Sequence, residues 1–298
     1  MRVLVTGASG FVGHAACREL LARGHEVRAL VRRAGSQPEG TAAVADDLTD
    51  AATLSTAVRE AAPEGVVHLA AEIATQRDAE RVREVNVEGM RLLEACGAAG
   101  APKVVFASTV VTGEAHGALL TEEEALPVDT PYGRSKQEGE ALLLSCGLPG
   151  VVVRPGHVYG PGGWYEHELA RLRRPGRFAV IGRGDNLWDV VHVDDVARAL
   201  VDALERAPAG ELYHAADDEP ISYYDFMALG AQALGVGVPR RIPAWVARLA
   251  AGPNAVTAVV RSARTSNAKL KRELGWAPRY ASAREGVPAT VAALAAAP

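Results

Sequence analysis

The sequence predicts an α/β protein in which helices cover both faces of a parallel β-sheet. Two observations carry this prediction. Short apolar runs alternate with helical patterns through the first half of the chain, which is typical of successive β-α-β units. Two of these runs, Val66–Leu69 and Lys103–Ala107, are almost continuously apolar, as strands buried on both faces of a sheet are.

The expected elements follow in chain order. We expect strands at Arg2–Thr6, Glu26–Val31, Ala42–Ala45, Val66–Leu69, Lys103–Ala107 and Gly150–Val153. We expect helices near Val12–Arg23, Ala51–Ala61, Gln76–Ala98 and Pro131–Ser145. Turn signals interrupt the pattern after Arg154, and a strand and helix return at Val190–Leu204, followed by a strand at Glu211–Ala215. The sheet domain is therefore assigned to residues 1–155 and 190–215, and a smaller, mostly helical domain to residues 156–189 and 216–298.

Composition excludes several classes of protein. The 298 residues are 48% apolar and 23% charged, as in ordinary globular proteins. The net charge of -4 gives no indication of a nucleic-acid or membrane partner. The three cysteines are far apart and form no CxxC pair, so we expect no structural disulfide, no metal site and a cytoplasmic location. We also expect no signal peptide and no membrane span.

A glycine-rich loop lies between the first strand and the first helix. Gly7, Gly10 and Gly13 frame it, and Phe11 and Val12 open the helix. Glycines here permit a tight turn, a close approach of the backbone to a pyrophosphate, and packing of the helix on the strand. The helix N-terminus directs free amides at the phosphates. The loop predicts a Rossmann-type dinucleotide site; the alternative is an incidental turn, since the chain has 30 glycines.

The end of the second strand bears on the choice of dinucleotide. An acidic residue there would bind the ribose hydroxyls of NAD(H), and none is present. Arg32 and Arg33 follow the strand instead, and both can pair with a 2′-phosphate. The alternative is a pair of solvated arginines. The sequence favours NADP(H) over NAD(H).

Tyr132 and Lys136 form a YxxxK pair at the start of an expected helix. Pro131 suits the first helical position, and either Asp129 or Thr130 can cap the helix. Residues four apart share a helix face, so both side chains can act on one ligand. We expect the ammonium and the helix N-terminus to lower the pKa of the tyrosine, which would make it a general acid or base. Lys136 would also bind the nicotinamide ribose. The alternative is a chance surface pair.

Ser108 comes directly after the apolar strand that ends at Ala107. Ligands bind at the carboxyl edge of a doubly wound sheet, so its hydroxyl is placed to polarise a substrate carbonyl. Thr109 is the competing candidate, and a serine that merely ends a strand is the alternative to both.

Taken together, these motifs resemble the extended short-chain dehydrogenase/reductase family, also described as NAD-dependent epimerases/dehydratases. The resemblance runs nearly end to end and rests on Thr6–Gly13, Asp46–Leu48, His68–Ala71, Asn86–Gly89, Ser108, Tyr132 with Lys136, Arg154–Gly162, Val191–Ala197 and Glu273–Trp276. It implies that Ser108, Tyr132 and Lys136 are the catalytic triad. It also implies a homodimer formed through the helices at Gln76–Ala98 and Pro131–Ser145.

The resemblance assigns further cofactor contacts. Asp47 and Leu48 would contact adenine, and Ala70 and Ala71 would line the dinucleotide. The backbone from Pro155 through His157 to Val158 would flank the nicotinamide.

Other matching positions have simpler structural interpretations. Asp194 or Asp195 is expected to cap the helix at Val196–Leu204, His192 and His68 to be buried core residues, and Asn86 to support a helix. A cluster of arginines is most simply a solvated face, although it can attract an anionic substrate: Arg171, Arg173, Arg174 and Arg177.

Two departures bear on the substrate. His157 stands where the family's nucleotide-sugar enzymes usually carry an Asn, and Trp188 stands where they carry an Arg. Aromatic residues expected to line the substrate domain are Trp164, Tyr165, Trp188 and Trp245. Such a pocket suits an apolar substrate better than a sugar diphosphate.

The sequence therefore predicts a carbonyl reductase or alcohol dehydrogenase that moves a hydride between NADP(H) and a small organic carbonyl. One alternative is a nucleotide-sugar epimerase or dehydratase with tightly held NAD(P). The other is a non-catalytic dinucleotide-binding sensor.

Overall fold

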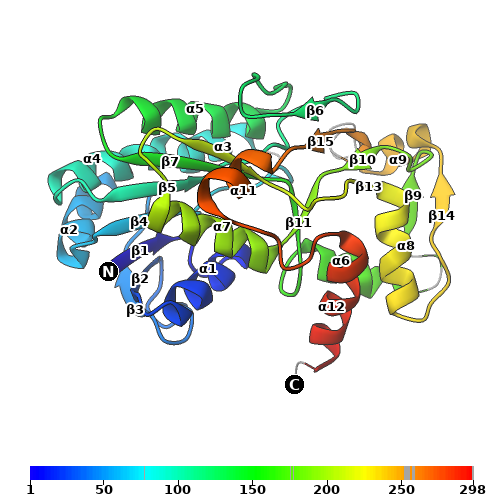
Figure 1. Cartoon of the computed structure of the whole chain (residues 1–298), viewed down its shortest axis with the longest axis horizontal. Coiled ribbons are helices and arrows are strands. Elements are labelled where there is room, and N and C mark those ends of the chain that lie inside the picture. The colour runs from blue at the N-terminus through cyan, green and yellow to red at the C-terminus, as the bar shows by residue number, and fades with distance from the viewer. Residues whose placement is uncertain (77, 175, 177, 252–255, 257–258, 297–298) are drawn as a thin grey trace.

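A computed structural model describes residues 1–76, 78–174, 176, 178–251, 256 and 259–296 (Figure 1). Its centre is a seven-stranded parallel sheet in the order β12-β7-β5-β4-β1-β2-β3. The strands are β1 (Arg2–Thr6), β2 (Glu26–Val31), β3 (Ala42–Ala45), β4 (Gly65–His68), β5 (Lys103–Ala107), β7 (Gly150–Pro155) and β12 (Leu212–Ala215). The predicted doubly wound Rossmann-type sheet is confirmed.

Successive side chains of the central strands enter two different cores, because they point to opposite faces of the sheet. Val3 and Val5 pack with α1 (Phe11–Ala22), α7 (Val193–Arg206) and α11 (Ala268–Leu274). Leu4, between them, packs on the other face. That second core is covered by α2 (Ala51–Ala61), α4 (Leu92–Ala98) and α5 (Pro131–Ser145).

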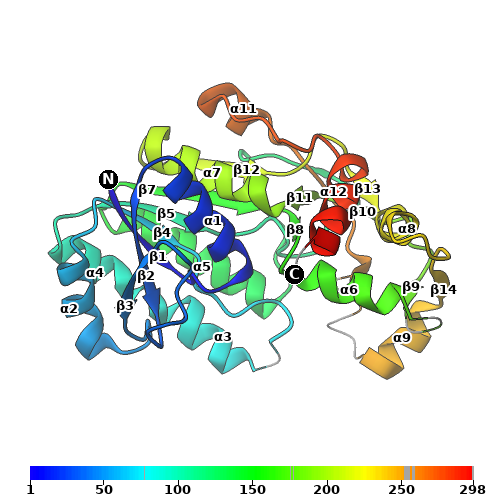
Figure 2. The same cartoon turned by 90° about the horizontal axis from the view of Figure 1, so that it is seen from below.

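A smaller, largely helical region lies beside the sheet and has its own aromatic core (Figure 2). Its helices are α6 (Trp164–Leu172), α8 (Tyr223–Ala233), α9 (Ala244–Ala251) and α12 (Ala283–Ala296). Pairs of short strands connect the two regions or brace the smaller one: β6 (Leu119–Leu120) with β15 (Arg264–Thr265), β8 (His157–Tyr159) with β11 (Val190–His192), β9 (Ala179–Ile181) with β14 (Arg240–Ile242), and β10 (Leu187–Trp188) with β13 (Ile221–Ser222).

The expected helix at Gln76–Ala98 is wrong as one unit. The structure divides it into α3 (Ala79–Asn86), a 3-10 turn η1 (Glu88–Arg91) and α4. Asp78 starts α3, because its carboxylate accepts from the amides of Glu80 and Arg81. In η1 the chain approaches the loop between β3 and α2 so closely that a Cβ on Gly89 would lie 2.9 Å from Leu48 Cδ2.

The expected cap of α7 by Asp194 or Asp195 is also wrong. His192 caps the helix, and its Nδ1 accepts from the amide of Asp194. The buried carboxylate of Asp195 instead accepts from the backbone of Arg279 and Tyr280, which ties the C-terminal segment to the sheet domain.

Asp217 follows β12 and is a second buried carboxyl group near Asp195. It is 4% exposed and accepts a 3.2 Å hydrogen bond from Tyr159. Burial, together with the Asp195 carboxylate, raises the pKa of Asp217 to about 8.

No helix in the described part of the chain is long and apolar enough to cross a membrane.

Candidate active site

The glycine loop is built as the sequence predicts. Gly7 has a positive φ of 68°, and a Cβ there would lie 2.6 Å from the backbone nitrogen of Ala70. A Cβ on Gly13 would lie 2.1 Å from the carbonyl oxygen of Gly7. Gly10 caps α1 without a side-chain hydrogen bond, and the first turn has no acidic residue. The amides at this helix N-terminus are therefore free to bind an anion.

A hollow of about 280 Å³ opens in front of this loop. Among the predicted cofactor residues, Gly7, Gly10, Arg32, Asp47, Leu48, Ala70 and Ala71 line it. The carboxylate of Asp47 accepts from Thr49, which lowers its pKa and keeps it ionised. Phe11 lies at the other end of the loop, where a Cβ on Gly163 would lie 2.6 Å from its ring. Val12 is partly buried and packs on the core. These residues fit an extended dinucleotide.

The two arginines after β2 differ in position. Both are exposed, but only Arg32 is among the described residues that line this hollow. The positive charge of Arg32 also contributes to the low pKa of Asp47. The structure therefore places Arg32, and not Arg33, at the cofactor hollow.

Thr6 and His68 join the ends of β1 and β4 below the loop. The Thr6 hydroxyl accepts from the amides of Leu69 and Ala70, so it donates to His68 Nδ1 at 2.6 Å. His68 is 1% exposed, and burial, with a smaller contribution from the charge of Lys136, lowers its pKa to about 3. The expectation that His68 is a core histidine is confirmed.

Helix α5 presents Tyr132 and Lys136. Thr130 is its cap and accepts from the amide of Gly133, which decides between the two expected caps. Burial raises the pKa of Tyr132 to about 12. The expected lowering of this pKa is therefore wrong in the protein without cofactor, because desolvation disfavours the phenolate.

Lys136 lies almost wholly inside the protein. It is 2% exposed, and its Nζ lies 4.2 Å from the centre of the Phe106 ring. Burial lowers the pKa of Lys136 to about 7, and the nearby Glu140 carboxylate opposes that shift. A lysine held this way can change its charge near neutral pH and serve as a tunable donor.

Ser108 and Thr109 are distinguished by their hydrogen bonds. Thr109 donates to the carbonyl of Pro155 and accepts from the amide of Val111, so its hydroxyl serves the backbone. Ser108 Oγ is buried and has no partner among the described residues. A buried hydroxyl without a partner is costly unless a ligand uses it, which favours Ser108 as the substrate-facing residue.

Asn86 does more than support a helix. Its side chain accepts from the amide of Glu72 and donates to the carbonyl of Glu72 and to Ser135 Oγ. The hydroxyl of Ser135 in turn donates to the carbonyl of Tyr132. Asn86 thus connects the wall of the cofactor hollow to the first turn of α5.

A buried ion pair that was not singled out from the sequence lies under α5. Arg154 Nε donates to Glu140 at 2.8 Å, and a second donor from the same guanidinium binds the other carboxylate oxygen. Glu140 is four residues after Lys136, so the helical spacing was an available signal.

His157 occupies the start of β8, two residues beyond Pro155. Its ring stacks on Trp188, with centroids 4.4 Å apart and planes at 3°. Its Nδ1 lies 3.1 Å from Asp189 Oδ1, and Arg261 binds the same carboxylate at 3.1 Å. Local sequence patterns do not indicate this cluster, because Arg261 lies 72 positions beyond Asp189.

The aromatic residues expected in the substrate pocket fall into two groups. Tyr165 and Trp188 are 0% and 4% exposed and belong to the core of the smaller region, so the expectation that these two side chains line a substrate pocket is wrong. Trp164 and Trp245 are 37% and 67% exposed. Trp164 Nε1 donates to the carbonyl of Val158, which places this ring beside the predicted nicotinamide segment.

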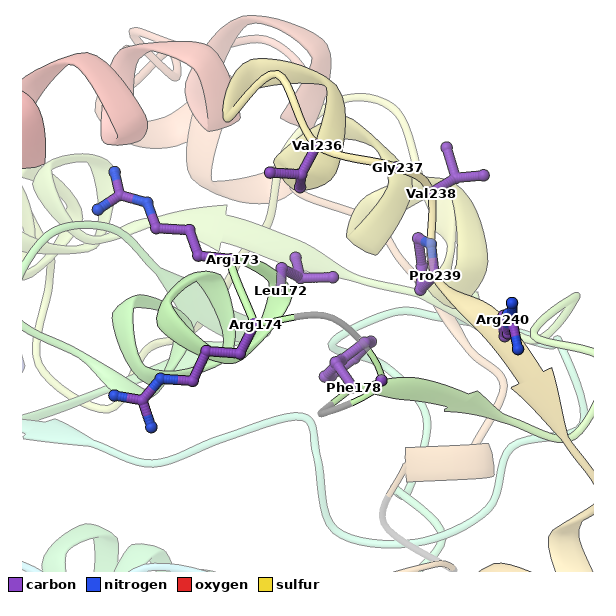
Figure 3. A pocket seen from close by; sticks show the side chains of 10 residues that line it. Leu172, Arg173, Arg174, Phe178, Val236, Gly237, Val238, Pro239 and Arg240 are labelled. Carbon is purple, nitrogen blue, oxygen red and sulfur yellow. The ribbon is translucent and has the colours of Figure 1, made fainter.

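A larger hollow of about 520 Å³ lies elsewhere, between the ends of α6 and α8 (Figure 3). Arg173, Arg174 and Arg240 line it together with apolar residues, and the first two side chains extend away from Pro239. Arg171 pairs with Glu168, and Arg177 lies outside the described residues. Ser108 and Tyr132 do not line this hollow, so we assign it no part in the chemistry.

Known proteins match this arrangement. The model of the NAD dependent epimerase/dehydratase family matches residues 3–216. A 3-diazoavenalumate denitrifying reductase from a Streptomyces species is 35% identical, over 96% of this chain and 99% of that protein. A 2-alkyl-3-oxoalkanoate reductase from Stenotrophomonas maltophilia is 30% identical, over 80% of this chain and 77% of that protein.

Among solved structures, the UDP-glucose 4-epimerase of Thermus thermophilus in complex with NAD superposes with a TM-score of 0.85 and 30% identity, over the full length of both chains. The cofactor hollow, the glycine loop and these matches agree, and the chain belongs to the NAD-dependent epimerase/dehydratase family, as an NAD(P)-dependent enzyme of the short-chain dehydrogenase/reductase type.

Proposed function

We propose that this enzyme is an NADPH-dependent reductase of a small organic carbonyl compound. The observation that carries the proposal is the buried hydroxyl of Ser108, which has no partner among the described residues, in a chain that also carries Tyr132 and Lys136 one turn apart on α5. When bound, NADPH would supply the hydride. Ser108 would donate to the carbonyl oxygen and Tyr132 would protonate that oxygen as negative charge develops on it.

The raised pKa of Tyr132 fits a proton-donating role for its phenol. A phenol with a pKa of about 12 remains protonated at neutral pH, so it is ready to donate to an alkoxide, which is a stronger base. The opposite role, removing a proton from an alcohol, needs a phenolate that burial disfavours. Tyr132 would therefore act as the proton donor when the reaction runs toward reduction.

Lys136 would bind the cofactor, and Asn86 would position helix α5. Lys136 would hydrogen-bond the nicotinamide ribose, and Asn86 would hold the first turn of α5 through Ser135. The exposed Arg32 at the hollow, with no acidic residue at the end of β2, favours NADP(H) over NAD(H).

Two features argue against a nucleotide-sugar substrate. Trp188 is buried against His157 and offers no charge to a diphosphate. Arg261 is 3% exposed and binds Asp189, Gly113 and Val110, so its guanidinium is already committed to the protein. The matched reductases support the same conclusion, whereas the matched epimerase supports the alternative of internal, non-consuming redox chemistry.

A second candidate reaction comes from the denitrifying relative. Its name describes reduction of a diazo compound. For an aryl diazonium cation, transfer of a hydride to the carbon that bears nitrogen releases N₂ and leaves a neutral arene, and this step would use the same cofactor site. That step forms a C–H bond and breaks a C–N bond. It requires no proton on an alkoxide, so Tyr132 would matter less for this reaction than for carbonyl reduction.

We also propose that residues 1–155 and 190–215 form the dinucleotide domain, that residues 156–189 and 216–298 form the substrate domain, and that the enzyme works in the cytoplasm as a homodimer. Helix α5 exposes Leu142 and Leu144, at 39% and 46%, on a surface available to a second copy. No nucleic acid or membrane partner is part of the proposal.

The test is a panel of ketones, aldehydes, β-keto acids and an aryl diazo compound, with loss of NADPH absorbance as readout. We expect NADPH consumption with at least one carbonyl compound. Interconversion of UDP-glucose and UDP-galactose without net NADPH consumption would instead establish the epimerase alternative.

A further inference from the structure

His157 has two ring nitrogens in different surroundings. Nδ1 faces the buried Asp189, and one face of the ring is covered by Trp188. Nε2 makes no hydrogen bond within the described part of the chain, and it is not among the fully buried unpartnered atoms. The side chain as a whole is 14% exposed.

Asp189 determines which of the two nitrogens donates. Its carboxylate is 1% exposed and accepts from Arg261 at 3.1 Å and from Thr265 at 2.5 Å. Burial raises the pKa of Asp189, but Arg261 and the hydrogen bond from His157 outweigh burial and hold it at about 2. An ionised carboxylate only accepts. The proton of the neutral imidazole is therefore on Nδ1, and Nε2 carries a lone pair.

The cluster of His157, Asp189 and Arg261 is hydrogen-bonded to the chain segments next to the proposed catalytic residues. Arg261 donates to the carbonyls of Val110 and Gly113, in the loop that begins at Ser108. The same loop also contacts the start of α5: Thr130, the N-cap of that helix, donates a hydrogen bond to the carbonyl of Thr112. His157 is thus connected, through Asp189 and Arg261, to the loop that follows Ser108 and leads to α5.

We infer that His157 Nε2 accepts a hydrogen bond from a hydroxyl group of the substrate, so that the preferred carbonyl compound carries a hydroxyl on an otherwise apolar body. The inference rests on the proposed function for the identity of the substrate. A carboxylate or methoxy group at this place would meet a lone pair and gain nothing, whereas a hydroxyl satisfies the acceptor.

The test measures binding and not turnover, so it remains informative if the reaction assignment fails. The probes are the three hydroxybenzaldehydes and their methyl ethers, bound to the NADP⁺-loaded enzyme in mildly alkaline buffer. The readout is quenching of tryptophan fluorescence. We expect one hydroxy compound to bind about three- to ten-fold more tightly than its ether, the value of one hydrogen bond.

Variants separate this role from a structural one. His157→Phe keeps a ring on Trp188 but removes the acceptor, so the preference for hydroxyl should disappear. His157→Gln offers a carbonyl oxygen and should restore part of it. His167→Phe, which replaces an exposed histidine on α6, is the matched control and should keep the full preference.

Nitrogen-15 NMR of the wild-type enzyme tests the tautomer independently of any variant's folding. We expect a protonated Nδ1, with a chemical shift of the unprotonated Nε2 that moves on adding the hydroxy compound. Equal affinity for all pairs in the wild type, a preference that survives in His157→Phe, or a proton on Nε2 in the neutral ring would each overturn the inference.

Discussion

Replacing Arg32 by alanine should remove the preference for NADP(H) and leave NAD(H) binding almost unchanged. A charge-assisted hydrogen bond contributes about 1.5–3 kcal/mol, which corresponds to roughly ten-fold to a hundred-fold in affinity. Two observations place the effect at the lower end of that range. Arg32 is exposed, so water and salt screen it, and the nearby carboxylates of Asp46 and Asp47 line the same hollow and repel a phosphate.

The assay is calorimetric titration of wild type, Arg32→Ala and Arg33→Ala with NADP⁺ and NAD⁺. Arg33 is the matched control, because it is equally exposed but does not line the hollow. We expect Arg32→Ala to weaken NADP⁺ about ten-fold, and Arg33→Ala to have a smaller effect. If Arg32→Ala weakened both cofactors equally, or if the wild type bound them equally, the reasoning about a 2′-phosphate site would be wrong.

Three further outcomes follow from the structure. Because the folded pKa of Asp217, about 8, lies above the unfolded value, its contribution to stability is present at acid pH and is lost as pH rises from ~3.9 toward about 8. Asp217→Asn should therefore flatten the dependence of Tm on pH and melt at a higher temperature than wild type at the alkaline end; a parallel profile would count against a buried neutral carboxyl. Gly13→Ala should abolish cofactor binding, since its Cβ would lie 2.1 Å from the carbonyl of Gly7, whereas Gly10→Ala, at 3.1 Å, should be milder in the same titration. Light scattering should give a dimer mass for wild type and a monomer for Leu144→Glu; a wild-type monomer at every concentration would refute the proposed interface.

The sheet was predictable because its strands are short apolar runs with clear boundaries. The run from Lys103 to Ala107 is short and mostly apolar, which is the pattern of a buried strand. The glycines at positions 7, 10 and 13 marked the loop between the first strand and the first helix. The helix breaks were not predictable. The 3-10 turn at Glu88–Arg91 lies where Gly89 packs closely on Leu48, and that tertiary contact could not be inferred from the local residues.

The site was predictable where local spacing decides it and not where tertiary contacts do. Tyr132 and Lys136 are one helical turn apart, so their pairing could be inferred. The sequence could not show that burial would dominate the pKa of Tyr132, because that depends on what covers the helix. The cluster of Asp189 and Arg261 likewise joins segments whose proximity only the fold creates.

Turnover of Tyr132→Phe on an accepted carbonyl substrate tests the central claim most directly. The change keeps the ring and removes the proton that Tyr132 would donate to the substrate oxygen. We predict that kcat falls by about 10²-fold or more while the Kd for NADP⁺ changes little. Near-normal kcat in this variant would contradict the account, because proton donation would then come from water or from the substrate itself.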